Sequence, residues 1–398
     1  MIKPTLRLKF ELRSGVRIIA AFVALFLSQW TNSGVAFAAS SDTQSALIFG
    51  PEWTFTNDKL IAADTSEDSN RPYVLKLREK VQLHFAKYCQ TSGKCKYLTD
   101  GGSEEFQILT PFGTYLTLGT DPGVFEVQSE PRSLEQWRAE SAYYQEVIFD
   151  NFKKIGLKPH LREGAGHLNI GIQYFEKNPK LLRNFIVDFY NHPGVGVVLN
   201  SLTANQFDSA YLDQWFERNH TGATSLSVYQ SFENFYQMAL DKLGVLDAKK
   251  NYALSDVREA VLLYTIPKWV ALGLRGTGSR FEATVINGRS RIEIRALRPQ
   301  ASMADFVRVI EIFEARVKFL SRVDRPLALL RPEPIEDGWK ALGQFADYLA
   351  EAGLNWQNYK TLMPQEWREL PEGNFIRKIQ NKNATAKSKM RSCRGFIF

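Results

Sequence analysis

Stretches with strand character and stretches with helical periodicity occur in separate groups along this chain. The former are rich in β-branched and aromatic residues, and several alternate polar with apolar residues, as strands do when one face is buried. Grouped strands and grouped helices favour an α+β fold with an antiparallel sheet over the regular alternation of a doubly wound fold. The predicted strands are 46–55, 106–109, 114–118, 124–129, 167–174, 281–286 and 291–296.

Two of the stretches with helical periodicity begin with a capping sequence. Ser133 is followed by Gln136, and Ser302 by Asp305, which are spacings typical of a helix start. At 44% hydrophobic residues the chain has ample material for a large core. No repeat, low-complexity linker or break in composition divides the middle, so we predict a single domain over 42–370. The predicted helices are 75–90, 133–155, 179–191, 208–219, 225–243, 254–272, 302–323 and 337–352.

The N-terminus has the order of an export signal. Basic residues up to Arg17 precede an apolar run at 18–27, and the small residues Ala36 and Ala38 follow it. This run is too short to cross a bilayer at about 1.5 Å of rise per residue. We therefore predict a signal peptide over 1–38, an exported (periplasmic or secreted) protein, and no stable membrane span after cleavage. An uncleaved anchor and an artefactual upstream start are the alternatives.

The positive charge of the chain belongs to its two ends. Five basic residues and one acidic residue give residues 1–38 a net charge of +4, and seven basic residues without an acid give residues 377–398 a net charge of +7. The whole chain carries +7, so the remaining body carries −4. This body offers no basic surface for a phosphate backbone, so we expect no nucleic-acid partner. The basic residues 377–398 are predicted to form a disordered tail.

The three cysteines are too few for a disulfide scaffold. Cys89 and Cys95 flank a polar turn of five residues, and in an oxidising compartment they can close a small loop. Two free thiols are the alternative. Cys393 lies in the predicted tail.

Polar side chains share one face of two of the predicted strands. Glu52 and Thr54 alternate with aromatic residues in the first strand, and Glu126, Gln128 and Glu130 form a similar row in and just after the fourth. A carboxylate in such a strand is costly to bury unless something pairs with it. For each strand alone, a polar face turned to water is the simpler explanation.

Two later strands add an imidazole and guanidinium groups. His167 and Asn169 share a face, and neutral imidazole is a common metal ligand. Arg291, Glu293 and Arg295 share a face of the last predicted strand, which returns from an Asn-Gly turn at 287–288. A hydrogen-bonded core histidine and a surface ladder of ion pairs are the simpler explanations here. A metal carboxylate flanked by phosphate-binding arginines is the alternative.

If these four strands are neighbours, their polar groups converge on one concave face. Carboxylates with a single imidazole suit Mg²⁺ or Mn²⁺ better than structural zinc. The sequence therefore predicts a divalent-cation site whose ligands are Glu52, Glu126, His167 and Glu293.

In this order the four segments resemble motifs of the amidoligase family, which belongs to the glutamine-synthetase-like carboxylate–amine ligases. FGPEWTF is similar to that family's Gly-x-Glu-x-Glu-Phe, and DPGVFEVQSEP to its Asp-Gly…Glu-Val-x-Ser-x-Pro. GAGHLNIG is similar to Gly-x-His-x-His-x-Gly, and RSRIEIRA to the Arg-x-Glu-x-Arg strand of glutamine synthetases. The resemblance spans roughly 46–323 and implies a curved, largely antiparallel sheet with helices packed around it.

The resemblance also implies roles for individual residues. It gives the four predicted ligands above as metal ligands, and Arg295 together with Arg291 as phosphate contacts. From it we expect Glu126, Glu293 and Arg295 to be catalytic. Arg275 and Arg280 are added as nucleotide-binding candidates because they flank a glycine-containing run.

The motifs depart from the family pattern at two positions. Thr54 stands where a second glutamate is usual, so the number of metals and the metal affinity are open. Asn169 stands where a second histidine is usual, and an amide hydrogen-bonds but does not shuttle a proton.

The implied reaction is the ATP- and Mg²⁺- (or Mn²⁺-) dependent formation of an amide or peptide-like bond. A carboxylate on a small molecule or peptide is activated as an acyl phosphate and then attacked by an amine. ATP is scarce outside the cytoplasm, so two alternatives stay open. One is a non-catalytic ligase fold that binds an amino compound, peptide or cell-wall fragment, and the other is a hydrolase with a remnant metal site. A carbohydrate-binding surface of tryptophans is less favoured, because most of them lie in helical or apolar stretches typical of a core.

Overall fold

The structure is a computed structural model, and it describes residues 46–63, 72–98, 105–121, 123–160, 166–199, 228–249, 251–265, 272–275, 290–331 and 338–363. Several predictions concern residues outside these ranges: the signal peptide, the basic tail, the helix at 208–219, the strand at 281–286, the turn at 287–288 and Arg280. All of the described residues belong to one compact unit.

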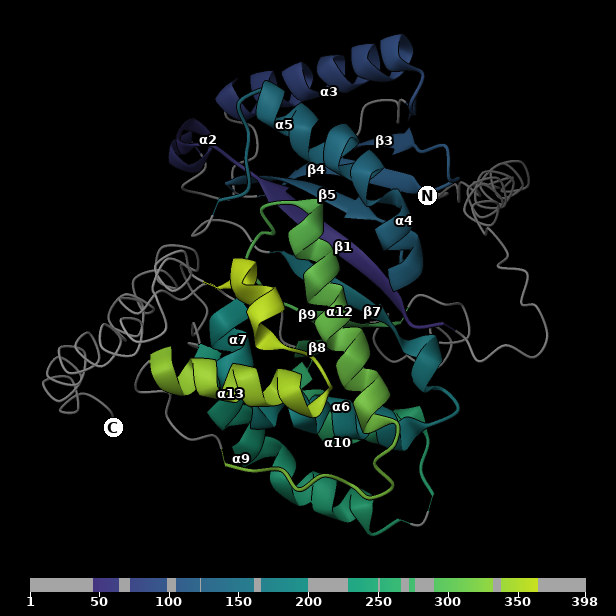
Figure 1. The fold of residues 1–398 in the computed structure, drawn as a ribbon, viewed down its shortest axis with the longest axis vertical. Coiled ribbons are helices and arrows are strands. Elements are labelled where there is room, and N and C mark those ends of the chain that lie inside the picture. The colour runs from purple at the N-terminus through teal and green to yellow at the C-terminus, as the bar shows by residue number, and fades with distance from the viewer. Residues whose placement is uncertain are drawn as a thin grey trace, which may run out of the picture. The chain divides into compact units, whose positions relative to one another are not determined.

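One antiparallel sheet organises the described residues (Figure 1). Its strands follow the order β2-β3-β4-β5-β1-β7-β9-β8, and β6 pairs with one end of β1. Every described strand pair is antiparallel, so the predicted α+β class with an antiparallel sheet is confirmed. The strands are β1 (Ile48–Phe55), β2 (Lys96–Leu98), β3 (Phe106–Leu109), β4 (Tyr115–Asp121), β5 (Val124–Ser129), β6 (Arg132–Ser133), β7 (His167–Gly171), β8 (Leu272–Arg275) and β9 (Arg291–Ile294).

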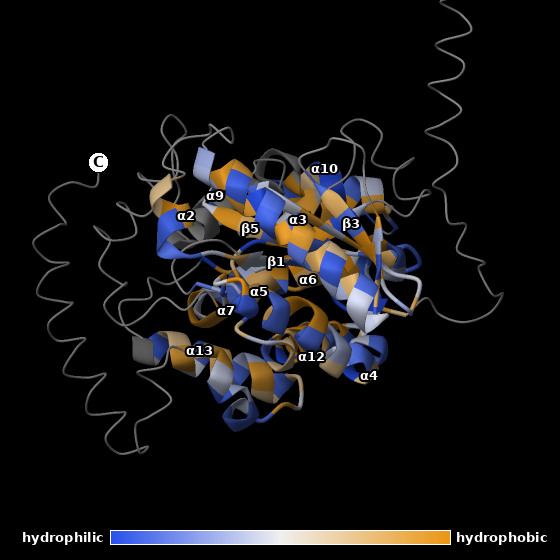
Figure 2. Cartoon of the chain, turned by 90° about the horizontal axis from the view of Figure 1, so that it is seen from above, coloured by the Kyte–Doolittle hydropathy of each residue, from blue (hydrophilic) through white to orange (hydrophobic). Residues whose placement is uncertain are grey.

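Helices make up most of the rest, and hydrophobic and hydrophilic residues alternate along α3 and α13 (Figure 2). They are α2 (Asp58–Ala63), α3 (Pro72–Ser92), α4 (Leu134–Tyr144), α5 (Asn151–Lys154), α6 (Pro179–Asn191), α7 (Pro193–Leu199), α9 (Val228–Asp247), α10 (Leu254–Thr265), α12 (Met303–Leu320) and α13 (Gly338–Glu351). Gln145–Asp150 is a π-helix, and Ile172–Phe175 and Trp356–Leu362 are 3-10 helices. No helix among the described residues has the length and apolar character needed to cross a membrane.

The predicted capping sequences both start helices. Ser133 forms a complete capping box with Gln136 at the start of α4, and the Ser302 hydroxyl accepts the backbone N–H of Asp305 at the start of α12. These local hydrogen bonds depend only on near neighbours in sequence.

Several predicted elements have different ends in the structure, three of them clearly so. The helix predicted over 133–155 is interrupted by the π-helix, and the one predicted over 254–272 ends at Thr265 before β8 begins at Leu272. The strand predicted over 167–174 ends at Gly171, because the chain turns there towards the Asn178 cap of α6. The strands β2, β6 and β8 were not predicted, since they are two to four residues long and contain no β-branched residue.

The apolar face of the sheet is covered by α3, α4, α5 and α12 (Figure 1). Trp53 of β1 lies edge-on to Trp137 of α4 and to Phe306 of α12, with ring centroids 5.8 and 5.3 Å apart. Phe55 stacks on Phe152 of α5 at 4.2 Å. Trp53 and Trp137 are almost fully buried, so these two tryptophans form core rather than a carbohydrate platform.

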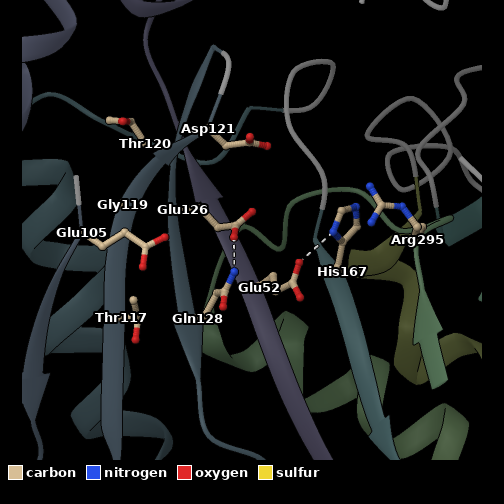
Figure 3. A pocket seen from close by; sticks show the side chains of 10 residues that line it. All are labelled: Glu52, Glu105, Thr117, Gly119, Thr120, Asp121, Glu126, Gln128, His167 and Arg295. Atoms are coloured by element: carbon tan, nitrogen blue, oxygen red, sulfur yellow. Dashed lines mark hydrogen bonds and ion pairs between the residues drawn. The ribbon is translucent and has the colours of Figure 1, made fainter. Parts of the chain in front are cut away.

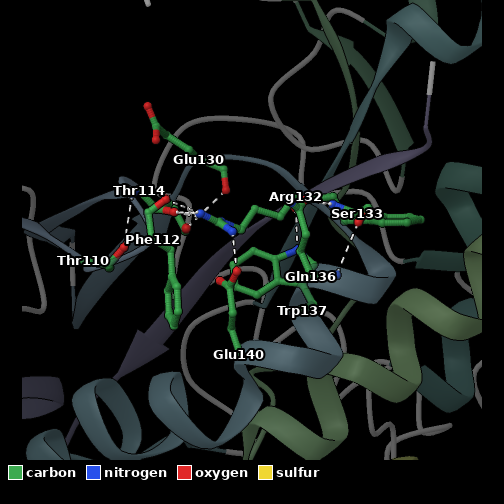
Figure 4. Close-up of polar contacts among 11 residues, drawn as sticks. Thr110, Phe112, Thr114, Glu130, Arg132, Ser133, Gln136, Trp137 and Glu140 are labelled. Carbon is green, nitrogen blue, oxygen red and sulfur yellow. Dashed lines mark hydrogen bonds and ion pairs between the residues drawn. The ribbon is translucent and has the colours of Figure 1, made fainter. Parts of the chain in front are cut away.

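A hydrogen-bonded clasp fixes the turn between β3 and β4 (Figure 4). Arg132 donates from Nε to the hydroxyl of Thr114 at 2.7 Å and from Nη2 to the carbonyl of Phe112 at 3.0 Å. Its Nη1 forms an ion pair with Glu140 of α4 at 2.5 Å. The clasp joins this end of the sheet to the helix that packs on it.

A buried ion pair joins the helices beyond the other end of the sheet. Arg316 of α12 bonds both carboxylate oxygens of Asp188 on α6, at 2.5 and 2.7 Å, and donates to the carbonyl of Tyr348 on α13 at 3.1 Å. Both charged residues are only 2% exposed or less. Because the guanidinium also lies 4.1 Å from the Tyr348 ring centroid, one side chain connects three helices.

Cys89 and Cys95 are joined in a disulfide that links the end of α3 to the start of β2. A loop of this size stabilises the folded state by about 2 kcal/mol through its effect on the unfolded chain. We expect the double variant Cys89→Ser/Cys95→Ser to lose about that much free energy of unfolding in urea titrations. A reducing agent should destabilise the wild type but not the variant. Equal stability of both proteins under oxidising conditions would contradict this.

Candidate metal centre

Polar side chains gather on the face of the sheet opposite the helices that cover it (Figure 3). The register places Glu52 of β1 opposite His167 of β7, and Asn169 of β7 opposite Glu293 of β9. Residues paired across antiparallel strands share a face, so strands far apart in sequence present their polar groups together.

Glu52, His167 and Glu293 form the centre of this face. Each offers a ligand atom, and the three atoms lie within 4.8 Å of one another. Nδ1 of His167 is 2.9 Å from Oε2 of Glu52 and 3.6 Å from Oε1 of Glu293. The two glutamates are 8% and 4% exposed. Two buried carboxylates and one imidazole at this spacing can hold a metal ion.

Hydrogen bonds from the same face hold this group in place. The Asn169 amide donates to Oε1 of Glu52 at 2.8 Å, and its oxygen accepts from Nε of Arg291 at 2.6 Å. Arg295 donates from Nη1 to Oε1 of Glu293 at 2.6 Å.

These contacts decide the protonation of Glu52. Burial by itself raises the pKa of this carboxyl, but the hydrogen bond and charge of His167 lower it. The Asn169 amide and the charge of Arg291 add to this, and the resulting pKa is about 2. Glu52 is therefore an anion at neutral pH, as a metal ligand has to be.

Glu126, the fourth predicted ligand, is not a member of this group of three. It lies on β5 opposite Thr54 and accepts a hydrogen bond from Gln128 at 2.5 Å. The reason is the register, because Gln128 rather than Glu126 stands directly across from Glu52. Burial first, and then the negative charge of Glu52, raise the pKa of Glu126 to about 7.

A cavity of about 230 Å³ is lined by Glu126 together with two members of the group, Glu52 and His167. Besides the predicted residues and Gln128, it is lined by residues in β4 and just before β3 that carried no prediction: Glu105, Thr117, Thr120 and Asp121. Gly119 makes room for one of them, since a Cβ there would lie 2.8 Å from Cγ of Glu105. The row of alternating polar residues in β4 was the available signal.

The predicted arginines have different positions. Arg295 lines the cavity and Arg291 is exposed at the start of β9. Arg275 is the last residue of β8 and stands opposite Arg291 in the register. β9 has β7 and β8 as its described partners.

The two departures from the family pattern both lie on the polar face. Thr54 is 5% exposed and stands two residues from Glu52, opposite Glu126. Asn169 connects Glu52 to Arg291.

In comparisons with known proteins, no family model and no curated protein matches this chain.

The raised pKa of Glu126 gives a pH-dependent stability. The folded protein keeps the proton up to about pH 7, whereas the ordinary value is 4.5, so the ionisable Glu126 costs stability as pH rises between these values. We expect Glu126→Gln, measured with a chelator present, to raise the free energy of unfolding by about 1 to 3 kcal/mol at pH 8. At pH 4.5 the variant and wild type should be nearly equal. A gain of the same size at both pH values would show that ionisation is not the cause.

Proposed function

We propose that this chain is a divalent-cation- and ATP-dependent ligase that joins a carboxylate to an amine, with the fold of the glutamine-synthetase-like amidoligases. The observation that carries the proposal is the buried group of Glu52, His167 and Glu293, whose ligand atoms lie within 4.8 Å of one another beside Arg295. The ordered motifs of the sequence support the same reaction.

The donor set fits a hard divalent cation. Carboxylate oxygens are the ligands that Mg²⁺ and Mn²⁺ prefer, and the set contains a single imidazole and no thiolate. Two carboxylates that are nearly removed from water also need compensating positive charge. Arg295 supplies some of it through its ion pair with Glu293, and a cation at the same place supplies more.

The arginines beside the group fit the anionic oxygens of a phosphate. A guanidinium presents a planar fork of donors that matches phosphate oxygens, and its charge is permanent. We assign this role to Arg295 and Arg291 first, and to Arg275 because its register position pairs with Arg291. Arg280 keeps the role only as a sequence-based candidate.

In this proposal ATP supplies the phosphoryl group that makes the carboxylate a better acyl donor. The amine then attacks the acyl carbon and inorganic phosphate leaves. Glu126 accepts the proton that the amine releases, and a pKa of about 7 suits a general base that works near neutral pH. Glu293 and Arg295 hold negative and positive charge, respectively, at fixed positions next to the cation site, so little reorganisation is needed during the reaction. The substrates are a carboxylate and an amine on small molecules or peptides.

We also propose that the protein is exported. A disulfide between Cys89 and Cys95 persists in an oxidising compartment, which agrees with the signal sequence. The ligase would then act where ATP is supplied, such as inside another cell.

A second candidate is non-catalytic binding of an amino compound, peptide or cell-wall fragment. It is favoured by the internal pairing of the site, in which Glu52 bonds His167 and Asn169 while Glu293 bonds Arg295. Charges that compensate one another without a cation can serve as a fixed recognition surface. Calorimetry with Mg-ATP separates the two functions, because a binding module gives no metal-dependent heat with the nucleotide.

The cation site is tested first. We expect isothermal titration calorimetry to show Mn²⁺ binding by the wild type, and at least about tenfold weaker binding by Glu52→Gln and Glu293→Gln, each of which loses one anionic ligand. Glu79→Gln is the control, because Glu79 is an exposed carboxylate on α3. Equal Mn²⁺ affinity of the wild type and all three variants would refute the proposed metal centre.

The reaction is tested by release of ADP from Mg-ATP in the presence of panels of carboxylates and amines. We expect turnover in the wild type and in Glu79→Gln, and loss of turnover in Glu293→Gln and Glu126→Gln, which remove a cation ligand and the general base. Circular dichroism melts check that the variants are folded. Unchanged rates in the two site variants would refute their assignment.

A further inference from the structure

Asn169 stands between two oppositely charged groups on the polar face. Its Nδ2 donates to Oε1 of Glu52 at 2.8 Å, and its Oδ1 accepts from Nε of Arg291 at 2.6 Å. The three residues come from β1, β7 and β9, which are consecutive neighbours in the sheet. In the register of β7 with β1, Asn169 stands opposite Gly50, which has no side chain to compete for the amide.

The chemistry of the two neighbours fixes how the amide is turned. An ionised carboxylate only accepts hydrogen bonds, and a guanidinium only donates them. A side chain that bridges them needs one donor and one acceptor on a short stem, and the Asn amide has both. An aspartate at this position lacks the donor and adds a negative charge against Glu52.

Together with His167, the bridge holds the Glu52 carboxylate at both of its oxygens. Asn169 binds Oε1, while Oε2 lies 2.9 Å from Nδ1 of His167. A carboxylate fixed at two points has lost its rotational freedom before a cation arrives, so less entropy is lost on binding.

We propose that Asn169 is a positioning residue, through which Arg291 orients the Glu52 carboxylate for binding of a divalent cation. The inference rests on the proposed cation site, but neither Asn169 nor Arg291 has to touch the cation. The departure from the family's histidine at position 169 then exchanges a potential ligand for a residue that orders another ligand.

Arg291 acts on the cation in two opposite ways. Its charge repels a cation, whereas its hydrogen bond to Asn169 orders Glu52. The repulsion stays when Asn169 is shortened, but the ordering is lost. A double-mutant cycle therefore separates the two effects.

The experiment measures Mn²⁺ affinity by calorimetry for the wild type, Asn169→Ala, Arg291→Ala and the double variant. We expect Asn169→Ala to bind Mn²⁺ about tenfold more weakly than the wild type. In the Asn169→Ala background, Arg291→Ala removes only repulsion, whereas in the wild type it also removes the ordering of Glu52. We therefore expect the ratio of Mn²⁺ affinities with and without Arg291→Ala to be at least about threefold lower in the wild type than in the Asn169→Ala background. The exposed position of Arg291 makes its substitution compatible with folding.

Gln107→Ala is the matched control, because Gln107 is a polar-face amide that bonds Thr117 on β4 instead of Glu52. Its Mn²⁺ affinity should equal that of the wild type. If melting curves show that Asn169→Ala is unfolded, Asn169→Thr replaces it, since its hydroxyl is too short to bridge both neighbours. Wild-type affinity in the Asn169 variant, or additive effects in the cycle, overturns this inference and leaves the cation site standing. Absence of Mn²⁺ binding in the wild type overturns both.

Discussion

The register of β1 against its two neighbours is the constraint on which the site depends. Side chains in a strand alternate between two faces, so a shift of one residue would send Glu52 into the aromatic core and Trp53 to the cavity. The packing of Trp53 and Phe55 against α4, α5 and α12 makes such a shift very costly. The apolar face therefore fixes where the polar face presents its carboxylates.

Charge compensation explains why those carboxylates can be buried. Glu52 has an imidazole and an amide within hydrogen-bonding distance, and its pKa is about 2. Burial and the charge of Glu52 instead raise the pKa of Glu126 to about 7. Two carboxylates in one cavity thus have opposite tendencies, one to remain an anion and one to exchange a proton. This separation is what supports a cation ligand and a general base in the same proposed ligase.

Rigidity at both ends of the sheet preserves this geometry. The Arg132 clasp fixes the β3–β4 turn, and the buried pair of Arg316 and Asp188 connects helices at the other end. A cation site needs its ligands to keep their spacing without the ion, and packing plus these charged contacts provide that. The disulfide adds a further restraint between α3 and β2.

The sequence by itself determined the local features: the capped helix starts at Ser133 and Ser302, the α+β class, and the alternation that places Glu52, His167 and Glu293 on the polar faces of their strands. These depend on short-range sterics and a period of two, both of which a sequence contains. Only the tertiary structure decided which strands are neighbours and in what register. That pairing brings His167 between two glutamates, and it places Gln128 rather than Glu126 opposite Glu52. Strand order and register follow from packing between residues that are distant in the chain, so the sequence alone did not reveal them.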